Sequence, residues 1–128
     1  MNRVLVYLDA IRDHLDSYAF PPVASVRVGF GPDPVSVQLD TDRLTDVARS
    51  LVVWADSLEN VTASIWRVPH GGSVHLEVQG RTLCGIPVVV YGGVRFDEAT
   101  FPDLPAGMRQ EMPVFVLRQW HTPGEVAA

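Results

Sequence analysis

The side chains of this 128-residue chain that could do chemistry are few, and one pair stands out. A single residue, Leu76, separates His75 from Glu77, in a stretch where apolar and polar residues alternate. Side chains two apart on a strand point to the same face, so this pair could share a metal ion or a proton. A His-x-Glu pair is also half of the zinc deaminase signature, but the Pro-Cys-x-x-Cys half is missing. A metal site would need His70 or His121 to join the pair, so we expect a solvated surface pair and no metal.

Nucleophilic and nucleotide-binding motifs are also missing. Cys84 is the only cysteine, which excludes an intrachain disulfide and a four-cysteine zinc site. It could act as a nucleophile only if the fold placed a histidine beside it. The chain has no Gly-x-Ser-x-Gly motif, and Gly29 and Gly31 lead into a proline-rich turn in place of a phosphate-binding loop. We therefore predict no catalytic residue, no cofactor and no enzymatic activity.

The charge and composition indicate a class of protein and a compartment. The net charge is −5, and all 10 basic residues are arginine. An acidic domain is a poor candidate for nucleic-acid binding, and the preference for arginine indicates GC-rich coding DNA, as in some bacteria and their phages. No apolar run approaches the roughly 20 residues of a membrane helix. Asp9, Asp13 and Asp16 argue against a secretory signal, and a lone thiol suits a reducing compartment. We expect a soluble cytoplasmic protein.

The elements that must position these residues follow from the spacing of apolar residues. Apolar residues three or four apart predict helices over 4–18 and 44–58. Alternation of apolar and polar residues predicts strands over 24–30, 35–39, 61–66, 73–83, 88–91 and 113–120. Residues 96–112 contain Pro102, Pro105 and Gly107 and are expected to be irregular, and residues 122–128 are expected to form a frayed tail.

Together these elements predict one α+β domain over residues 1–128. We expect a two-layer sandwich in which two helices cover one face of an antiparallel sheet of five to six strands, in the order αββαβββ(β). Residues 1–40 form a first helix-hairpin unit, residues 41–94 a second, and residues 95–128 an irregular segment, a last strand and the tail. The sequences of 24–28 and 63–67 are similar, which suggests an αββ duplication; chance similarity among strand residues is the alternative.

One face of this sheet would be left without helices. Strand alternation assigns to it Ser25, Arg27, Ser36, Gln38, Thr62, Ser64, Trp66, His75, Glu77, Gln79 and Tyr91. The plain interpretation is a solvated surface, but Trp, Tyr and Arg are also the residue types that most often anchor interfaces. The partner-binding candidates on this face are Arg27, Trp66, His75, Glu77 and Tyr91. Trp120, next to the tail, is a further candidate that either folds onto the core or docks on a partner.

From these features we predict a small non-catalytic interaction protein: an accessory, adaptor, inhibitor or immunity-type factor. It would act through the exposed sheet face or an edge strand, and its partner would be a basic protein or a second copy of itself. One alternative is a small-molecule-binding domain or small enzyme, with a pocket between the sheet and the C-terminal segment that uses Arg27, His75, Glu77 or Tyr91. A second alternative is a structural subunit of a phage or another large assembly.

Overall fold

The computed structural model describes residues 2–121, which form three helices and six strands; the expected tail lies outside this part. In chain order the elements are α1 (Arg3–Ser17), β1 (Val23–Val28), β2 (Val35–Leu39), α2 (Leu44–Ser57), β3 (Glu59–Arg67), β4 (Ser73–Arg81), β5 (Pro87–Arg95), β6 (Arg109–Met112) and α3 (Phe115–His121). The α+β class expected from the sequence is confirmed.

All six strands belong to one sheet, in the order β1-β2-β5-β4-β3-β6. Strands β3, β4 and β5 form a meander, and β5 then pairs with β2 in parallel, with Val37 opposite Val90. The expectation of a purely antiparallel sheet is therefore wrong at this one pairing. The reason is the connection through α2, which returns the chain so that β5 reaches the free side of β2 running in the same direction.

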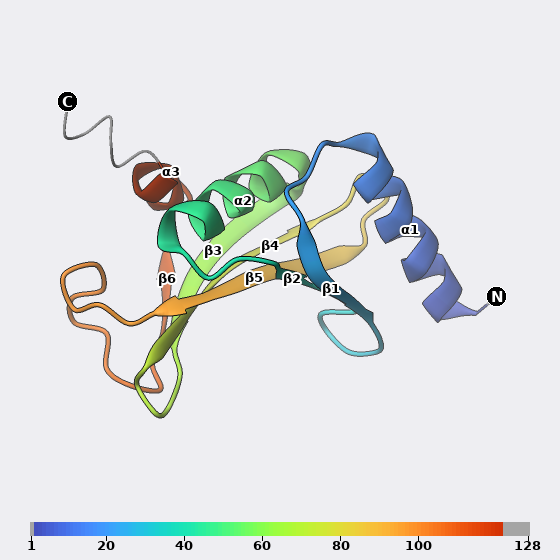
Figure 1. Cartoon of the computed structure of the whole chain (residues 1–128). Helices are drawn as coiled ribbons and strands as arrows, with labels where there is room; N and C mark the ends of the chain where they lie inside the picture. The colour runs from blue at the N-terminus through green and yellow to red at the C-terminus, as the bar shows by residue number, and fades with distance from the viewer. Residues whose placement is uncertain (1, 122–128) are drawn as a thin grey trace.

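The helices lie on one side of this sheet (Figure 1). Helix α2 runs over the middle of the sheet, α3 packs beside α2, and α1 lies at the end where the β4–β5 turn is. Three helices are present where two were expected. The apolar sides of the strands face α2, and the residues here that are completely buried include Val47, Leu51, Trp54, Val37, Leu76 and Val90. The other face of the sheet, which carries no helix, is called the open face below.

The predicted last strand over 113–120 is wrong, because this segment forms α3. Pro113 has no N–H to continue a ladder, and its carbonyl accepts a hydrogen bond from the Val116 N–H at 3.1 Å. This bond starts a helical turn, in which Leu117 and Trp120 fall on one side, three residues apart. Leu117 is fully buried, whereas Phe115 is 57% exposed. A short run of β-branched and aromatic residues was compatible with both structures, and the contact of Leu117 with the core decided between them.

The expectation that residues 96–112 are irregular is correct only up to Met108, because the next four residues form β6 on the edge of β3. Arg67 holds the loop that leads to β6. Its guanidinium donates to the carbonyls of Gly71 at 3.0 Å and Leu104 at 2.8 Å, and it lies 3.5 Å from the centre of the Phe96 ring. Five N–H donors in a rigid plane suit this combination of carbonyls and an aromatic ring. Arg67 thereby fixes where the chain enters β6.

The helices of the two predicted helix-hairpin units pack differently. Helix α2 is buried along a whole side, whereas only Ile11 and His14 of α1 are buried. The two hairpins are also separated in the sheet by β5. Duplication of an αββ unit therefore stays a prediction.

Candidate functional site

The residues predicted to share the open face do lie on it, because cross-strand partners point to the same side of a sheet. Trp66 is opposite His75, Ser64 is opposite Glu77, and Glu77 is in turn opposite Tyr91. The face therefore brings four of the candidate residues together at its centre: Trp66, His75, Glu77 and Tyr91. Arg27 lies on the same face but at its edge, on β1.

Three rings form a row across β3, β4 and β5. The His75 ring is 5.2 Å from the Trp66 ring, edge to face, and 5.7 Å from the Tyr91 ring, to which it is nearly parallel. Gly93, the neighbour of His75 on β5, leaves space above the strand for the imidazole. All three rings are half-buried, so each retains an exposed part that a partner could touch.

Burial lowers the pKa of His75 below its ordinary value; the charge of Glu77 raises it again, and that of Arg109 adds to the lowering. The lowered pKa favours the neutral imidazole at neutral pH, so the row of rings presents an uncharged aromatic surface.

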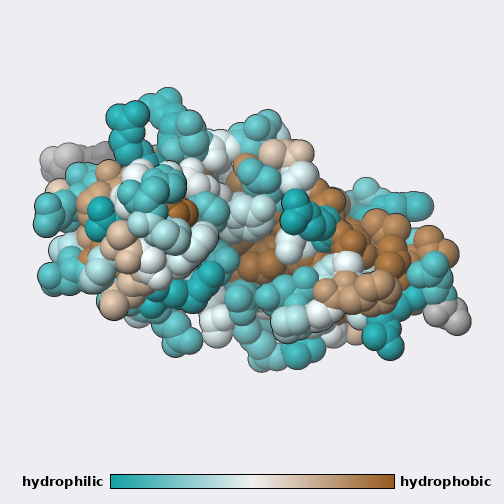
Figure 2. Space-filling view, turned by 90° about the horizontal axis from the view of Figure 1, so that it is seen from below, coloured by the Kyte–Doolittle hydropathy of each residue, from teal (hydrophilic) through white to brown (hydrophobic). Residues whose placement is uncertain are grey.

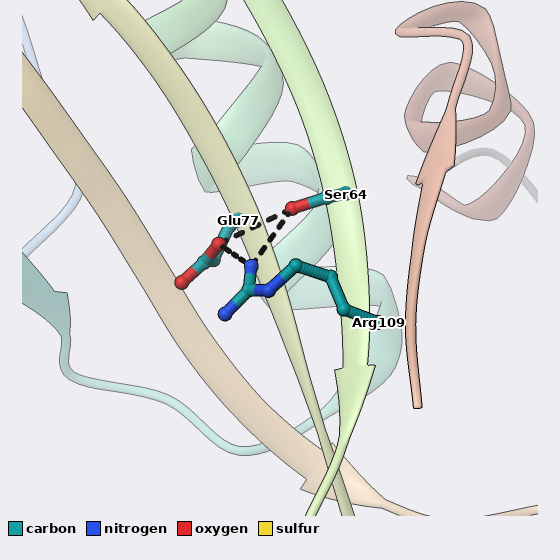
Figure 3. Close-up of polar contacts among 3 residues, drawn as sticks. All are labelled: Ser64, Glu77 and Arg109. Carbon is teal, nitrogen blue, oxygen red and sulfur yellow. Dashed lines mark hydrogen bonds and ion pairs between the residues drawn. The ribbon is translucent and has the colours of Figure 1, made fainter. Parts of the chain in front are cut away.

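Glu77 is held by residues on the two strands beyond it (Figure 3). Arg109 reaches from β6 across β3 and forms an ion pair with Glu77, and it also donates to Ser64 Oγ at 3.2 Å. The Ser64 hydroxyl donates in turn to Glu77 Oε2 at 3.2 Å. His75 and Glu77 thus point to the same face as predicted, but the carboxylate is engaged by Arg109. Within residues 2–121 no three His, Cys, Asp or Glu side chains are grouped so as to hold a metal ion.

A groove of about 470 Å³ lies on the open face, next to the row of rings. Its lining comes from strands β2 to β6 and the β1–β2 turn: Asp33, Ser36, Thr62, Ala63, Ser64, Glu77, Gln79, Val89, Tyr91, Arg109 and Glu111. Three of these residues are carboxylates and one is a guanidinium, so the lining has a formal charge of −2. Trp66 and His75 stand one row along the sheet from Ser64 and Glu77 and do not line the groove.

Arg109, Glu111 and Asp33 were not among the residues predicted for the site. Arg109 and Glu111 fell in the segment expected to be irregular, and the run from Arg109 to Met112, with three polar residues in succession, lacks the apolar–polar alternation that indicates a strand. Asp33 belongs to a turn, and nothing local indicates that the turn leans over the sheet. The pairing of β6 with β3 brings Arg109 and Glu111 to the groove.

Two other predicted features lie away from the open face. Trp120 packs against the core on the helix side, with its ring 5.4 Å from that of Phe101. Cys84 is exposed in the β4–β5 turn, near the hollow that His14 lines. Nε2 of His14 is 2.9 Å from Ser57 Oγ, so this nitrogen is not directed at the thiol.

Comparison with models of protein families, with curated proteins and with solved structures gave no match. None of the helices formed by residues 2–121 has the length and apolar character needed to cross a bilayer.

Proposed function

We propose that this chain is a small non-catalytic interaction protein that binds a basic segment of a partner protein on the open face of its sheet. The observation that carries the proposal is the charge of the groove, which holds three carboxylates and one guanidinium beside a row of three half-buried rings. A cationic side chain of the partner would enter the groove, and the neighbouring chain would lie over the rings.

The chemistry of the groove favours an arginine or lysine side chain. Glu77 is already neutralised by Arg109, but the carboxylates of Asp33 and Glu111 have no ion-pair partner within residues 2–121. They are free to accept the N–H donors of a guanidinium or ammonium group. Trp66 and Tyr91 supply large surfaces that cost little entropy to order, as is usual for residues that anchor an interface.

The proposal can be tested by NMR titration of the isotope-labelled chain with two peptides of equal length, one rich in arginine and the other with glutamate in its place. We expect saturable shifts confined to the groove lining on β2 to β6 and the β1–β2 turn, and to the neighbouring row of rings, with the arginine peptide alone. Glu111→Gln should weaken binding about threefold, the scale of a partly exposed ion pair. Asp16→Asn on α1 removes the same charge away from the groove and serves as the matched control. Equal binding of the two peptides, or an equal loss in both variants, would rule out this face.

The row of rings gives a second arm of the same test. Trp66→Ala should weaken binding of the arginine peptide about tenfold, because a large interface aromatic often contributes more than 1 kcal/mol to binding. Phe115→Ala removes an exposed aromatic ring from α3, outside the groove lining, and should leave binding unchanged. Circular dichroism of both variants establishes that the fold is kept.

A small cationic molecule is the second candidate ligand. The groove lies on the open face of the sheet, with Arg109 and Glu111 of β6 in its lining, and its volume is within the range of small-molecule sites. Free arginine in the same titration separates the two candidates: binding as tight as that of the peptide would favour a small-molecule site, or an enzyme that acts on such a molecule. A cytoplasmic location and a bacterial or phage source also stay proposals, which rest on the single cysteine and on the absence of lysine.

A further inference from the structure

The two edge strands of the sheet, β1 and β6, differ in how well they are protected against pairing with a strand of another chain. Strand β6 has four residues, two of them charged, and is followed by Pro113. Shortness, charge and proline are the usual features that keep an edge strand from pairing with another chain. Strand β1 is less protected: its six residues include three valines and a single charge, that of Arg27, although Pro22 precedes the strand and its register with β2 shifts between Val23 and Ser25.

The backbone of β1 is available along its outer side. Four consecutive residues of the strand, 24–27, are exposed, and within residues 2–121 no strand pairs with this side. The Gly29 N–H donates to the Pro34 carbonyl at 2.9 Å, which fixes the phase of the β1–β2 ladder. Because hydrogen-bonded and non-hydrogen-bonded pairs alternate, Arg27 directs its backbone groups to β2. Val26 and Val28 direct theirs outward.

Exposed apolar side chains gather at the same end of the molecule. Figure 2 shows the open face, with the largest apolar area extending from its middle to the end where α1 lies. The large apolar side chains exposed on α1, β1 and the turn after β1 include Leu5 (56%), Leu8 (43%) and Phe30 (76%). Apolar surface of this kind next to an unpaired strand marks an association surface.

We infer that two copies of this chain associate through β1, in an antiparallel pair around a two-fold axis at Val26. In this register Val26 lies opposite Val26 of the second copy, and Ser25 lies opposite Arg27. An axis at Arg27 would instead place the two guanidinium groups opposite each other, which is unfavourable. The charge pattern of the strand therefore favours the axis at Val26 over the axis at Arg27.

A second copy fits this edge better than an unrelated strand. A two-fold pair uses each of the longer, less charged β1 edges once and leaves only the short β6 edges exposed, so the assembly is closed at two copies. The register also sets Phe30 opposite Pro22 of the second copy, which covers the most exposed apolar ring of the turn. The inference is independent of the proposed function, because β1 contributes no residue to the groove lining, which comes from β2 to β6 and the β1–β2 turn.

Sedimentation velocity over a range of protein concentrations tests the inference. We expect the chain to be a dimer, and Val26→Lys to raise the dissociation constant at least about tenfold, since a lysine on an edge strand opposes pairing. Gln110→Lys makes the same kind of change on the β6 edge and should leave the dimer intact. A monomer at all concentrations overturns the inference, as does a dimer that both variants weaken equally or that Val26→Lys leaves unchanged.

A gain of affinity tests the register and does not depend on how Val26→Lys folds. Ser25→Glu sets a carboxylate opposite Arg27 of the second copy, twice in each dimer. At low salt we expect dimerisation about threefold tighter, and the gain should be lost as salt screens the pairs. With the axis at Arg27, residue 25 would have no cation opposite. Unchanged or weaker association of Ser25→Glu would therefore overturn the Val26 register.

Discussion

At the scale of single residues, His14 shows how strongly the core constrains a titratable group. The side chain is 5% exposed, and its ring lies 5.5 Å from that of Phe20 and 5.7 Å from that of Trp54. The Ser57 hydroxyl donates to the Trp54 carbonyl at 2.7 Å, so the hydroxyl oxygen accepts from His14 Nε2–H. Burial lowers the pKa of His14 below its ordinary value of 6.5.

This lowered pKa predicts a loss of stability in mild acid. The unfolded chain takes up the His14 proton at its ordinary pKa, before the folded chain does, so protonation favours unfolding. Above about pH 6.5 the neutral His14 does not reduce the free energy of unfolding. This free energy decreases as the pH falls from about 6.5 toward the lowered pKa of His14 in the folded chain, and His75 acts in the same direction. In His14→Phe, the decrease in melting temperature between about pH 7 and about pH 5 should be smaller than in the unmodified chain.

Thermal unfolding followed by circular dichroism provides the measurement. His70→Phe, which changes an exposed histidine, is the matched control and should keep the full decrease. If His14→Phe and the unmodified chain lose the same number of degrees, burial of His14 is not what links stability to pH.

At the scale of elements, the approach of α2 to β5 depends on one glycine. A Cβ atom at Gly92 would lie 2.9 Å from Cγ1 of Val47 and 3.3 Å from Cδ1 of Leu39, both in the core. At Gly93, one residue further on the opposite face, the nearest atom would be Cδ2 of His75 at 3.6 Å, an ordinary contact. Gly92 therefore faces the tightly packed core, whereas its neighbour Gly93 lies on the open face, where a methyl group has room.

We therefore predict opposite results for two neighbouring substitutions. Gly92→Ala should lower the free energy of unfolding by about 1–3 kcal/mol, because the core must move to admit the methyl group. Gly93→Ala should leave it unchanged or raise it by up to about 1 kcal/mol, because alanine restricts the unfolded chain. Urea denaturation of both variants measures the difference. A Gly93→Ala variant as destabilised as Gly92→Ala would contradict the assignment of faces on β5.

The elements also show where local sequence was a poor guide. Residues 113–120 have a composition typical of a strand, and residues 109–112 follow a segment rich in proline and glycine, yet the first form α3 and the second form β6. In both cases the outcome depends on what the segment contacts: Leu117 fits against α2, and Arg109 to Met112 complete the edge of β3. Short segments have weak intrinsic preferences, so such contacts outweigh them.

At the scale of the whole molecule, charge should control how fast a basic partner is found. The chain carries 15 acidic and 10 basic side chains, and the groove concentrates this excess on one face. Exposed charges act over a Debye length, which is about 8 Å at physiological ionic strength. Attraction of a basic partner is therefore sensitive to salt.

For the arginine-rich peptide, we predict an association rate that falls several-fold between about 20 and about 200 mM NaCl, with a smaller change in the dissociation rate. Glu111→Gln should reduce this dependence on salt, and Asp16→Asn on α1 should reduce it less. Stopped-flow fluorescence, with Trp66 as the reporter, measures both rates. If neither rate changes with salt, the charge of the acidic groove does not control binding of the peptide.

The sequence by itself determined the α+β class, β1 to β5, the two long helices and the face on which the residues of these five strands lie. These features follow from local periods: a run of alternating residues points its polar side chains one way wherever the strand is placed. Tertiary structure alone decided the strand order, the parallel β2–β5 pair, the formation of β6 and α3, and the convergence of Asp33, Glu111 and Arg109 in one groove. These depend on which distant segments meet and in what register, and the period of a single segment contains no information about its neighbour.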